Sequence, residues 1–246
     1  MEGFRRVARS AARRRIEDVE ILDRSLLRGG RAAAVEGARF GDPVRHGKWL
    51  VFPADDSEVL MHFGMTGRLD WARRGSERHR HDRIVFVCRG GELRYRNMRK
   101  FGGVWISKRG RERVTGPLGP DAAEVDRERF HELLGRRRGR IKAALMDQKL
   151  IAGLGNLMAD EIAWRARVNP RAQVGRLSPR RIDRLWEAMD EVVRDSLPTG
   201  RVPPAEGWLT RVRDAREPSC PRCGARLRKS TVAGRTTAWC PRCQRR

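Results

Sequence analysis

The sequence predicts an α+β protein with a β-rich N-terminal region, a helical region and a C-terminal ribbon organised by cysteines. Short apolar runs, separated by Gly, Asp or Arg clusters, indicate strands of a sandwich or barrel up to about residue 107. From Asp126 onward the apolar residues recur at helical spacing instead. The clearest linker is Pro-Leu-Gly-Pro at 117–120, so we place the boundaries at 1–119, 120–197 and 198–246.

The expected strands are short and bounded by turn residues. Arg89-Gly90-Gly91 reads as the turn of a hairpin between two of them. Cys88 ends an apolar run and is expected to be a buried strand residue. The strands fall at 48–53, 59–63, 83–88, 92–95 and 103–107.

The helical region contains a break that resembles an elbow. Gly153-Leu154-Gly155 interrupts the helical pattern, and Asn156 is well placed to be the N-cap of the next helix. Ser178-Pro179 supplies a cap and a first-turn proline for a further helix. Residues 197–219 read as a loop leading into the ribbon.

Four of the five cysteines form two Cys-x-x-Cys pairs, separated by sixteen residues. A zinc ribbon needs four thiolates in such pairs, with a spacer of about 15–20 residues. Two disulfides are the alternative, but the chain has no secretory signal to support them. The sequence therefore predicts one structural zinc ion, held by Cys220, Cys223, Cys240 and Cys243.

The charge points to a polyanionic partner. The chain has 55 basic and 31 acidic residues and a net charge of +24. Such a charge repels itself unless a polyanion neutralises it, which favours nucleic acid over a membrane surface or an acidic protein. No stretch approaches the roughly 20 apolar residues of a membrane span, and we expect a cytoplasmic protein.

Several residues stand where nucleic acid is commonly bound, and each has an ordinary alternative. Amides of the 153–155 elbow and the Asn156 side chain could hold a phosphate, although such a sequence is also a good structural turn. Met65 and Phe101 follow strands in glycine-rich turns and could be wedges between bases, although spacing alone favours the core. Lys48 begins a strand, where a lysine is usually only solvated.

Taken in order, these motifs resemble the formamidopyrimidine-DNA glycosylase/endonuclease VIII family of base-excision repair enzymes. The resemblance runs from about Glu2 to Arg246 and rests on motifs at 45–50, 62–69, 97–102, 145–161 and 220–244. It implies an N-terminal β-sandwich, a helix–two-turn–helix domain, a zinc-ribbon hairpin and damaged double-stranded DNA as the partner. It also implies a monomer.

The resemblance assigns roles to single residues. Lys48 matches the lysine associated with β-elimination, and Arg235 looks like the hairpin arginine that grips phosphates and takes part in δ-elimination. Asn156 matches the phosphate-binding asparagine of the elbow. The trio that fills the gap in the duplex, and the further DNA contacts, correspond to Met65, Arg99 and Phe101, and to His79, Arg138 and Lys142.

The N-terminus departs from the family pattern. Family members begin, after the initiator Met, with Pro-Glu-Leu-Pro-Glu/Asp-Val-Glu, and the proline amine is the nucleophile that attacks the sugar. Met1 aligns with the valine and Glu2 with the later glutamate, so Glu2 is not the catalytic glutamate. Because a GTG valine codon read as a start is written Met, we expect the natural start to lie upstream.

The expected function is excision of oxidised bases from duplex DNA with cleavage of the abasic site. The alternatives are an inactive binder of damaged or abasic DNA and, more remotely, an RNA-binding zinc-ribbon protein. The 197–219 loop is shorter than the loop that closes over oxidised purines in the family, which leaves oxidised pyrimidines open as substrates.

Overall fold

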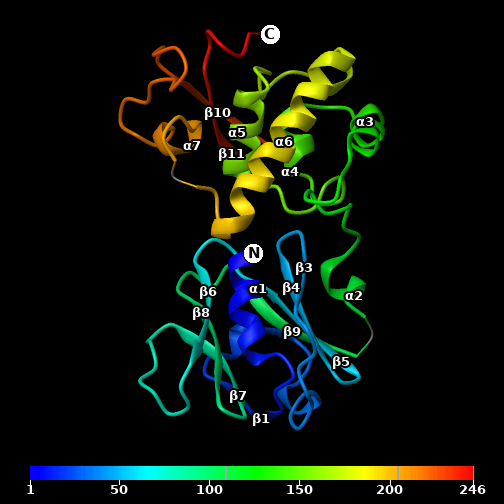
Figure 1. Ribbon diagram of the computed structural model, residues 1–246, viewed down its shortest axis with the longest axis vertical. Helices are drawn as coiled ribbons and strands as arrows, with labels where there is room; N and C mark the ends of the chain where they lie inside the picture. Colours follow the sequence, from blue (N-terminus) through cyan, green and yellow to red (C-terminus); the bar gives the residue numbers. More distant parts are fainter. Residues whose placement is uncertain (109, 204, 246) are drawn as a thin grey trace. The chain divides into compact units, whose positions relative to one another are not determined.

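A computed structural model of the protein describes residues 1–108, 110–203 and 205–245. Contacts between Cα atoms divide the chain into two units, Met1–Pro117 and Leu118–Arg246. Figure 1 shows strands throughout the first unit and helices in most of the second. The helical region and the ribbon fall within one unit, because Trp164 of the helical region packs in one apolar cluster with Cys220 and Cys240.

The first unit contains two sheets. The four-stranded sheet has the order β1-β7-β8-β6, and the five-stranded sheet has the order β2-β9-β5-β4-β3. The helices of this unit are α1 (Glu2–Ala8) and α2 (Glu112–Thr115), with 3-10 turns at Arg9–Ala11, Arg24–Leu26 and Ala32–Ala34. The strands are β1 (Ile16–Ile21), β2 (Leu27–Gly29), β3 (Val44–His46), β4 (Trp49–Ala54), β5 (Ser57–His62), β6 (Gly67–Ala72), β7 (Asp82–Cys88), β8 (Gly91–Asn97) and β9 (Gly103–Ser107).

One apolar core joins the two sheets. The ring of Phe40 lies 4.3 Å from that of Phe52 in β4 and 5.6 Å from that of Phe86 in β7, measured between centroids. β4 belongs to the five-stranded sheet and β7 to the four-stranded sheet, so these rings bridge the two. Such packing removes most apolar surface from water, the main favourable term in folding. The predicted sandwich is confirmed.

Strand β6 was missed by the sequence analysis. It lies at the edge of its sheet and pairs only with β8, through Gly67–Asn97 and the following pairs. Its sequence alternates Arg68, Leu69, Asp70 and Trp71, and only Leu69 is fully buried. An edge strand has one unpaired side and tolerates charged residues, so it lacks the apolar run that marked the other strands.

The second unit is helical and ends in a hairpin. Its longest helix begins after Ser178, with Pro179 at the first position, and ends at Thr199, two residues beyond the expected boundary. The C-cap residue, Gly200, is left-handed (φ 69°). Residues of this helix pack into a core that also contains Ile141, Leu154 and Ile162. The elements are α3 (Arg127–Gly135), α4 (Ile141–Met146), α5 (Asn156–Arg165), a 3-10 turn (Val174–Arg176), α6 (Pro179–Thr199), α7 (Leu209–Val212), β10 (Arg228–Val232) and β11 (Arg235–Trp239).

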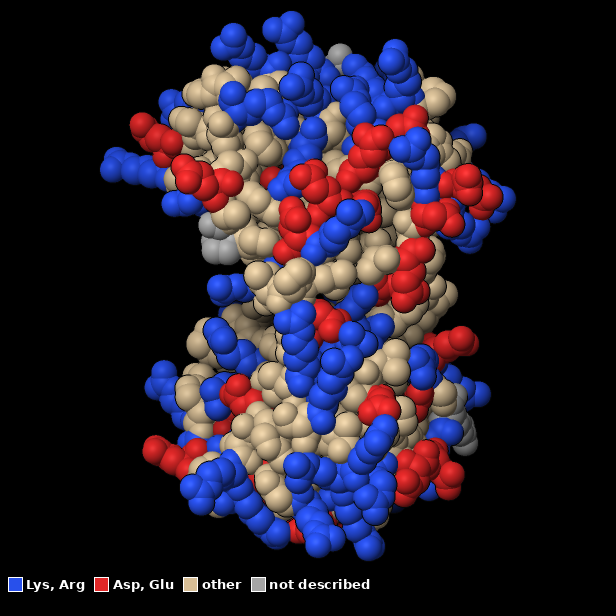
Figure 2. Space-filling model, in the orientation of Figure 1, with Lys and Arg blue, Asp and Glu red and all other residues tan. Residues whose placement is uncertain are grey.

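The surface of both units is rich in positive charge. Figure 2 shows lysine and arginine side chains spread over the visible face of both units, with acidic side chains in smaller groups. Within the described residues, no helix is both long and apolar enough to cross a membrane.

Candidate nucleic-acid interface

Two turns of the first unit carry exposed apolar side chains. The Met65 side chain is 67% exposed and that of Phe101 is 58% exposed. Leaving such a side chain in water forgoes roughly 1.5–3 kcal/mol of burial free energy. Neither residue belongs to the core, so the interpretation that spacing alone favoured is wrong. Arg99, also exposed, lies with its guanidinium carbon 5.3 Å from the centroid of the Phe101 ring.

Strand register explains why these turns meet. Residues 63–66 lead from β5 to β6, and residues 98–102 lead from β8 to β9, so both segments cross between the two sheets. β5 pairs with β9 through His62 and Gly103, while β6 pairs with β8 through Gly67 and Asn97. The two crossings therefore start and end beside each other, and the predicted trio of Met65, Arg99 and Phe101 is brought together.

Lys48 lies in the tight turn between β3 and β4, beside Gly47, whose φ is positive (57°). Because Trp49 pairs with His62 across β4 and β5, this hairpin places the lysine near His62. Burial, and then the charge of Lys48, lower the pKa of the His62 imidazole. Neutral His62 accepts a hydrogen bond at Nδ1 from the Gly64 amide, 3.3 Å away. His62 was not among the functional residues predicted from the sequence. The available signal was its place as the first residue of the glycine-flanked turn.

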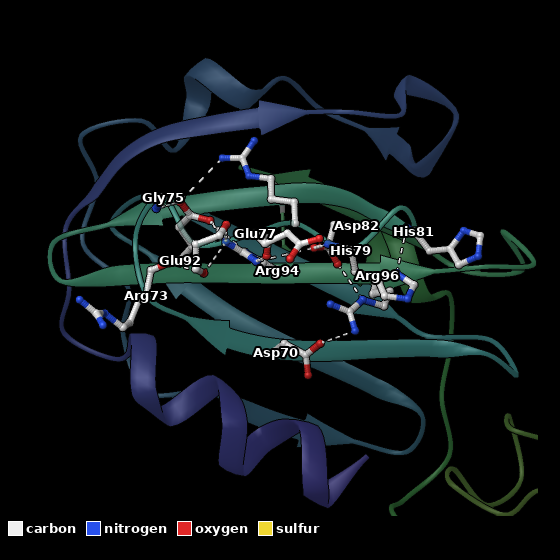
Figure 3. Close-up of polar contacts among 12 residues, drawn as sticks. Asp70, Arg73, Gly75, Glu77, His79, His81, Asp82, Glu92, Arg94 and Arg96 are labelled. Carbon is white, nitrogen blue, oxygen red and sulfur yellow. Dashed lines mark hydrogen bonds and ion pairs between the residues drawn. The ribbon is translucent and has the colours of Figure 1, made fainter.

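His79 is exposed on a turn whose backbone is held by a network of buried charged side chains (Figure 3). The His79 amide donates to Asp82 Oδ2 at 3.0 Å, and the Asp82 side chain is fully buried. Arg96 donates to the other carboxylate oxygen at 2.8 Å, and Arg94 is paired with Glu92 at 2.8 Å. Asp82 therefore fixes the backbone of the turn while the His79 ring stays accessible.

The elbow before α5 is braced by Gln148. Its amide nitrogen donates to the carbonyl of Leu154 at 3.0 Å, and its Oε1 accepts from the Gly153 amide at 3.0 Å. The expectation for Asn156 as N-cap is wrong, because Gly155 is the N-cap and Asn156 is the first residue of the helix. Its Oδ1 is buried, and in the described part of the chain no donor reaches it. Because Gly155 is the N-cap, the side-chain amide of Asn156 does not cap the helix.

Lys142 does not lie where a DNA contact requires it. Its side chain is fully buried, with Nζ 2.7 Å from the Asp160 carboxylate and 2.8 Å from the carbonyl oxygen of Thr236. Arg213 pairs with the same carboxylate. Burying an ammonium group is tolerated only with such partners, so the predicted contact of Lys142 with DNA is corrected to a structural role. Arg138, in contrast, is exposed.

Arg235 is exposed at the tip of the β10–β11 hairpin. The two turn residues, Ala233 and Gly234, both have positive φ (49° and 70°), as a two-residue hairpin turn of type I′ requires. The next residue, Thr236, is held by Lys142 and by Arg213, which donates to the same carbonyl at 3.1 Å. The backbone beside Arg235 is therefore fixed from the helical core.

The four predicted cysteines come together at the base of the hairpin. Their sulfur atoms all lie within 4.8 Å of one another, with Cys220 and Cys243 at 4.0 Å and Cys223 and Cys240 at 3.5 Å. A tetrahedron with metal–sulfur distances of 2.3 Å has edges of about 3.8 Å, so this set fits zinc. All four positions are filled by protein, so the ion is structural and organises the ribbon that presents Arg235.

The two sheets, the glycine elbow and the cysteine ribbon, in a chain with a net charge of +24, define a zinc-containing protein of the nucleic-acid-binding class. Three family descriptions match consecutive parts of it: the formamidopyrimidine-DNA glycosylase N-terminal domain at residues 2–104, the H2TH domain of the same enzyme at 118–203, and the zinc finger found in FPG and IleRS at 219–246. The chain belongs to the formamidopyrimidine-DNA glycosylase family.

Individual relatives agree. The formamidopyrimidine-DNA glycosylase of Symbiobacterium thermophilum is 38% identical, over 94% of this chain and 83% of that protein. The Streptomyces avermitilis enzyme is 36% identical, over 98% and 94%. Two crystal structures of Lactococcus lactis Fpg, one with Fapy-dG-containing DNA and one with abasic-site DNA, are each 26% identical with a TM-score of 0.88. Both cover 100% of this chain, and the chain covers 98% and 97% of them.

Proposed function

We propose that this protein, a base-excision repair DNA glycosylase with abasic-site lyase activity, opens duplex DNA with the paired turns of its first unit. The observation that carries the proposal is the exposure of Met65 and Phe101 beside Arg99. The sugar carbon of a damaged nucleotide cannot be reached inside a stacked duplex, so the nucleotide must be turned out. Apolar side chains that enter the resulting gap keep it from closing.

Contacts with phosphates hold the DNA strand. We assign them to Asn156 at the start of α5, Arg235 at the hairpin tip, and the exposed His79 and Arg138. Such contacts fix register and orientation without reading sequence. They suit an enzyme that must recognise a lesion in any sequence context, and they account for part of the net charge of +24.

The chemistry follows the family scheme. An amine attacks the sugar C1′, the damaged base leaves with the C1′–N bond electrons, and the resulting imine acidifies the neighbouring carbon. Loss of a proton from that carbon then expels the 3′ phosphate. We assign assistance in this β-elimination to Lys48, and in the following δ-elimination to Arg235. The attacking amine is that of the family's N-terminal proline, which precedes the residue aligned with Met1.

Strand-cleavage assays test this function. A labelled duplex carrying a single oxidised purine, oxidised pyrimidine or abasic site is incubated with the protein, and an undamaged duplex is the control. We expect cleavage only at the lesion, with a 3′ phosphate end where δ-elimination follows. Binding without cleavage by a chain that carries the proline would favour the inactive DNA binder, and preference for single-stranded RNA would favour the RNA-binding alternative. We also propose that the protein acts as a monomer in the cytoplasm.

A further inference from the structure

We propose that Asn97 and Thr66 are positioning residues that couple the Met65 turn to the Arg99–Phe101 turn, so that the duplex is opened by one rigid wedge. This inference rests on the proposed function, because it requires that the turns enter DNA. Neither residue is exposed at the tips. Asn97 is fully buried at the end of β8, and Thr66 is half-buried immediately before β6.

The Asn97 side chain uses both of its ends. Its Oδ1 accepts from the Thr66 hydroxyl at 3.3 Å and from the Lys100 amide at 3.0 Å. Its Nδ2 donates to the Tyr95 hydroxyl at 3.0 Å and to the Phe63 carbonyl at 3.4 Å. One amide group therefore ties the beginning and end of the first turn to the backbone of the second.

Thr66 and Tyr95 complete the connection. The Thr66 hydroxyl, besides donating to Asn97, accepts from the Arg99 amide at 3.1 Å. The Tyr95 hydroxyl donates to the His62 carbonyl at 2.8 Å, where the first turn begins. Each polar side-chain atom of Thr66, Tyr95 and Asn97 therefore has a hydrogen-bond partner of the complementary kind, donor with acceptor. A satisfied buried network of this kind specifies one arrangement of the chain.

Two glycines let the turns approach closely. A Cβ on Gly64 would lie 2.4 Å from the Phe101 carbonyl oxygen, and Gly64 also has a positive φ (59°). A Cβ on Gly102 would lie 2.0 Å from the His62 carbonyl oxygen. Each glycine belongs to one turn and touches the backbone of the other, so the turns are packed together as well as hydrogen-bonded.

The second turn is also braced from outside. Lys100 has a positive φ (56°), which is unusual for a residue with a side chain. Its ammonium group pairs with Asp23 at 2.8 Å, and Arg28 donates to its carbonyl at 3.2 Å. Asp23 and Arg28 thus hold the Arg99–Phe101 turn in place. Asn97 and Thr66 connect the Met65 turn to it through hydrogen bonds. A wedge that is already ordered loses less conformational freedom when it enters the DNA.

The test measures how far the bases beside the gap are unstacked. A residue that only stabilised the fold would not change this signal. The probe is a duplex with a tetrahydrofuran abasic analogue and 2-aminopurine beside the base opposite it, because 2-aminopurine brightens when it is unstacked. Thr66→Val removes the hydroxyl at nearly constant volume, and Thr66→Ser keeps it. We expect Thr66→Val to lower the fluorescence gain at saturating protein at least twofold, with Thr66→Ser close to the wild type and Phe101→Ala abolishing the gain.

Controls separate coupling from folding. Ser57→Ala removes another buried hydroxyl of the same unit, bonded to the Ala34 carbonyl at 3.3 Å, and should leave the gain unchanged. Asn97→Ala should lower the gain as Thr66→Val does. If Asn97→Ala fails to fold, the two Thr66 variants still test the coupling, because Thr66 is only half-buried. The coupling alone would be overturned if Thr66→Val gave the same fluorescence gain as the wild type. It would also be overturned if Ser57→Ala lowered the gain as much as Thr66→Val does. No gain with the wild-type protein would overturn the wedge as well.

Discussion

The Lys142 ammonium group lies 2.7 Å from the Asp160 carboxylate, and neither side chain is exposed to solvent. Burial lowers the pKa of Lys142 and raises that of Asp160. Because the pair also holds the backbone of Thr236 through Lys142, it joins α4 and α5 to the hairpin strand that begins with Arg235. The pair therefore supports, from inside, the hairpin whose Arg235 we propose to contact DNA.

Replacing Lys142 with alanine should destabilise the second unit. The change leaves Arg213 as the charged partner of Asp160, beside the Ala238 amide, and removes the lysine from the Thr236 carbonyl. Breaking a buried pair costs about 3–5 kcal/mol. The free energy of unfolding in urea measures this cost. Lys149→Ala is the matched control, since Lys149 is exposed. Equal stability of the two variants would contradict the structural role of Lys142.

Arg235→Ala should weaken binding to abasic duplex DNA and reduce its salt dependence. Loss of one phosphate contact lowers the slope of log K against log salt by about 0.9. Fluorescence anisotropy at several salt concentrations gives this slope. Arg180→Ala, which removes an exposed arginine from the start of α6, is the control and should leave the slope unchanged. The assigned role in δ-elimination further predicts that Arg235→Ala accumulates the β-elimination product.

Removal of zinc should unfold the ribbon and abolish tight DNA binding. Native mass spectrometry should find one zinc ion in the wild-type protein and none in Cys240→Ser, because three thiolates leave the tetrahedral site incomplete. Cys88→Ser is a matched control, since Cys88 is buried in β7 and is not one of the four clustered cysteines. Loss of zinc from Cys88→Ser, or its retention in Cys240→Ser, would be inconsistent with this site.

The first unit should lose stability as the pH falls below about 6.5, the ordinary pKa of histidine. Burial lowers the pKa of His62, so the unfolded chain takes up its proton first and unfolding is favoured on acidification. Protonation also removes the acceptor that Nδ1 offers to the Gly64 amide. His62→Asn keeps an acceptor there but does not titrate. Melting temperatures between pH 5 and 8 should fall more steeply for the wild type than for this variant.

The sequence was most informative where one physical rule dominates locally. The Cys-x-x-Cys spacing predicted the four sulfur atoms that now lie together, and apolar runs predicted β4, β5, β7, β8 and β9 to within a few residues. The helix that begins at Pro179 followed from its cap residue and its first-turn proline. Each of these signals depends on neighbouring residues alone.

What could not be predicted depends on residues distant in the chain. Lys142 matched a DNA contact of the family in the sequence, and only the fold brings Asp160 and Thr236 to it. Met65 and Phe101 are apolar, and spacing could not show that their turns cross between sheets at paired strand ends. Assignment of Asn156 as a cap failed because a glycine with extended backbone already occupies that position.

Borohydride trapping on abasic duplex DNA is the measurement that tests the central claim most directly. The protein preceded by Pro-Glu-Leu-Pro-Glu should form a covalent adduct, since borohydride reduces the imine between its terminal amine and the sugar. The same chain with an acetylated amine should form none. Absence of an adduct from the free amine, or an undiminished adduct after acetylation, would contradict the account of this protein as a glycosylase/lyase that works through an N-terminal amine.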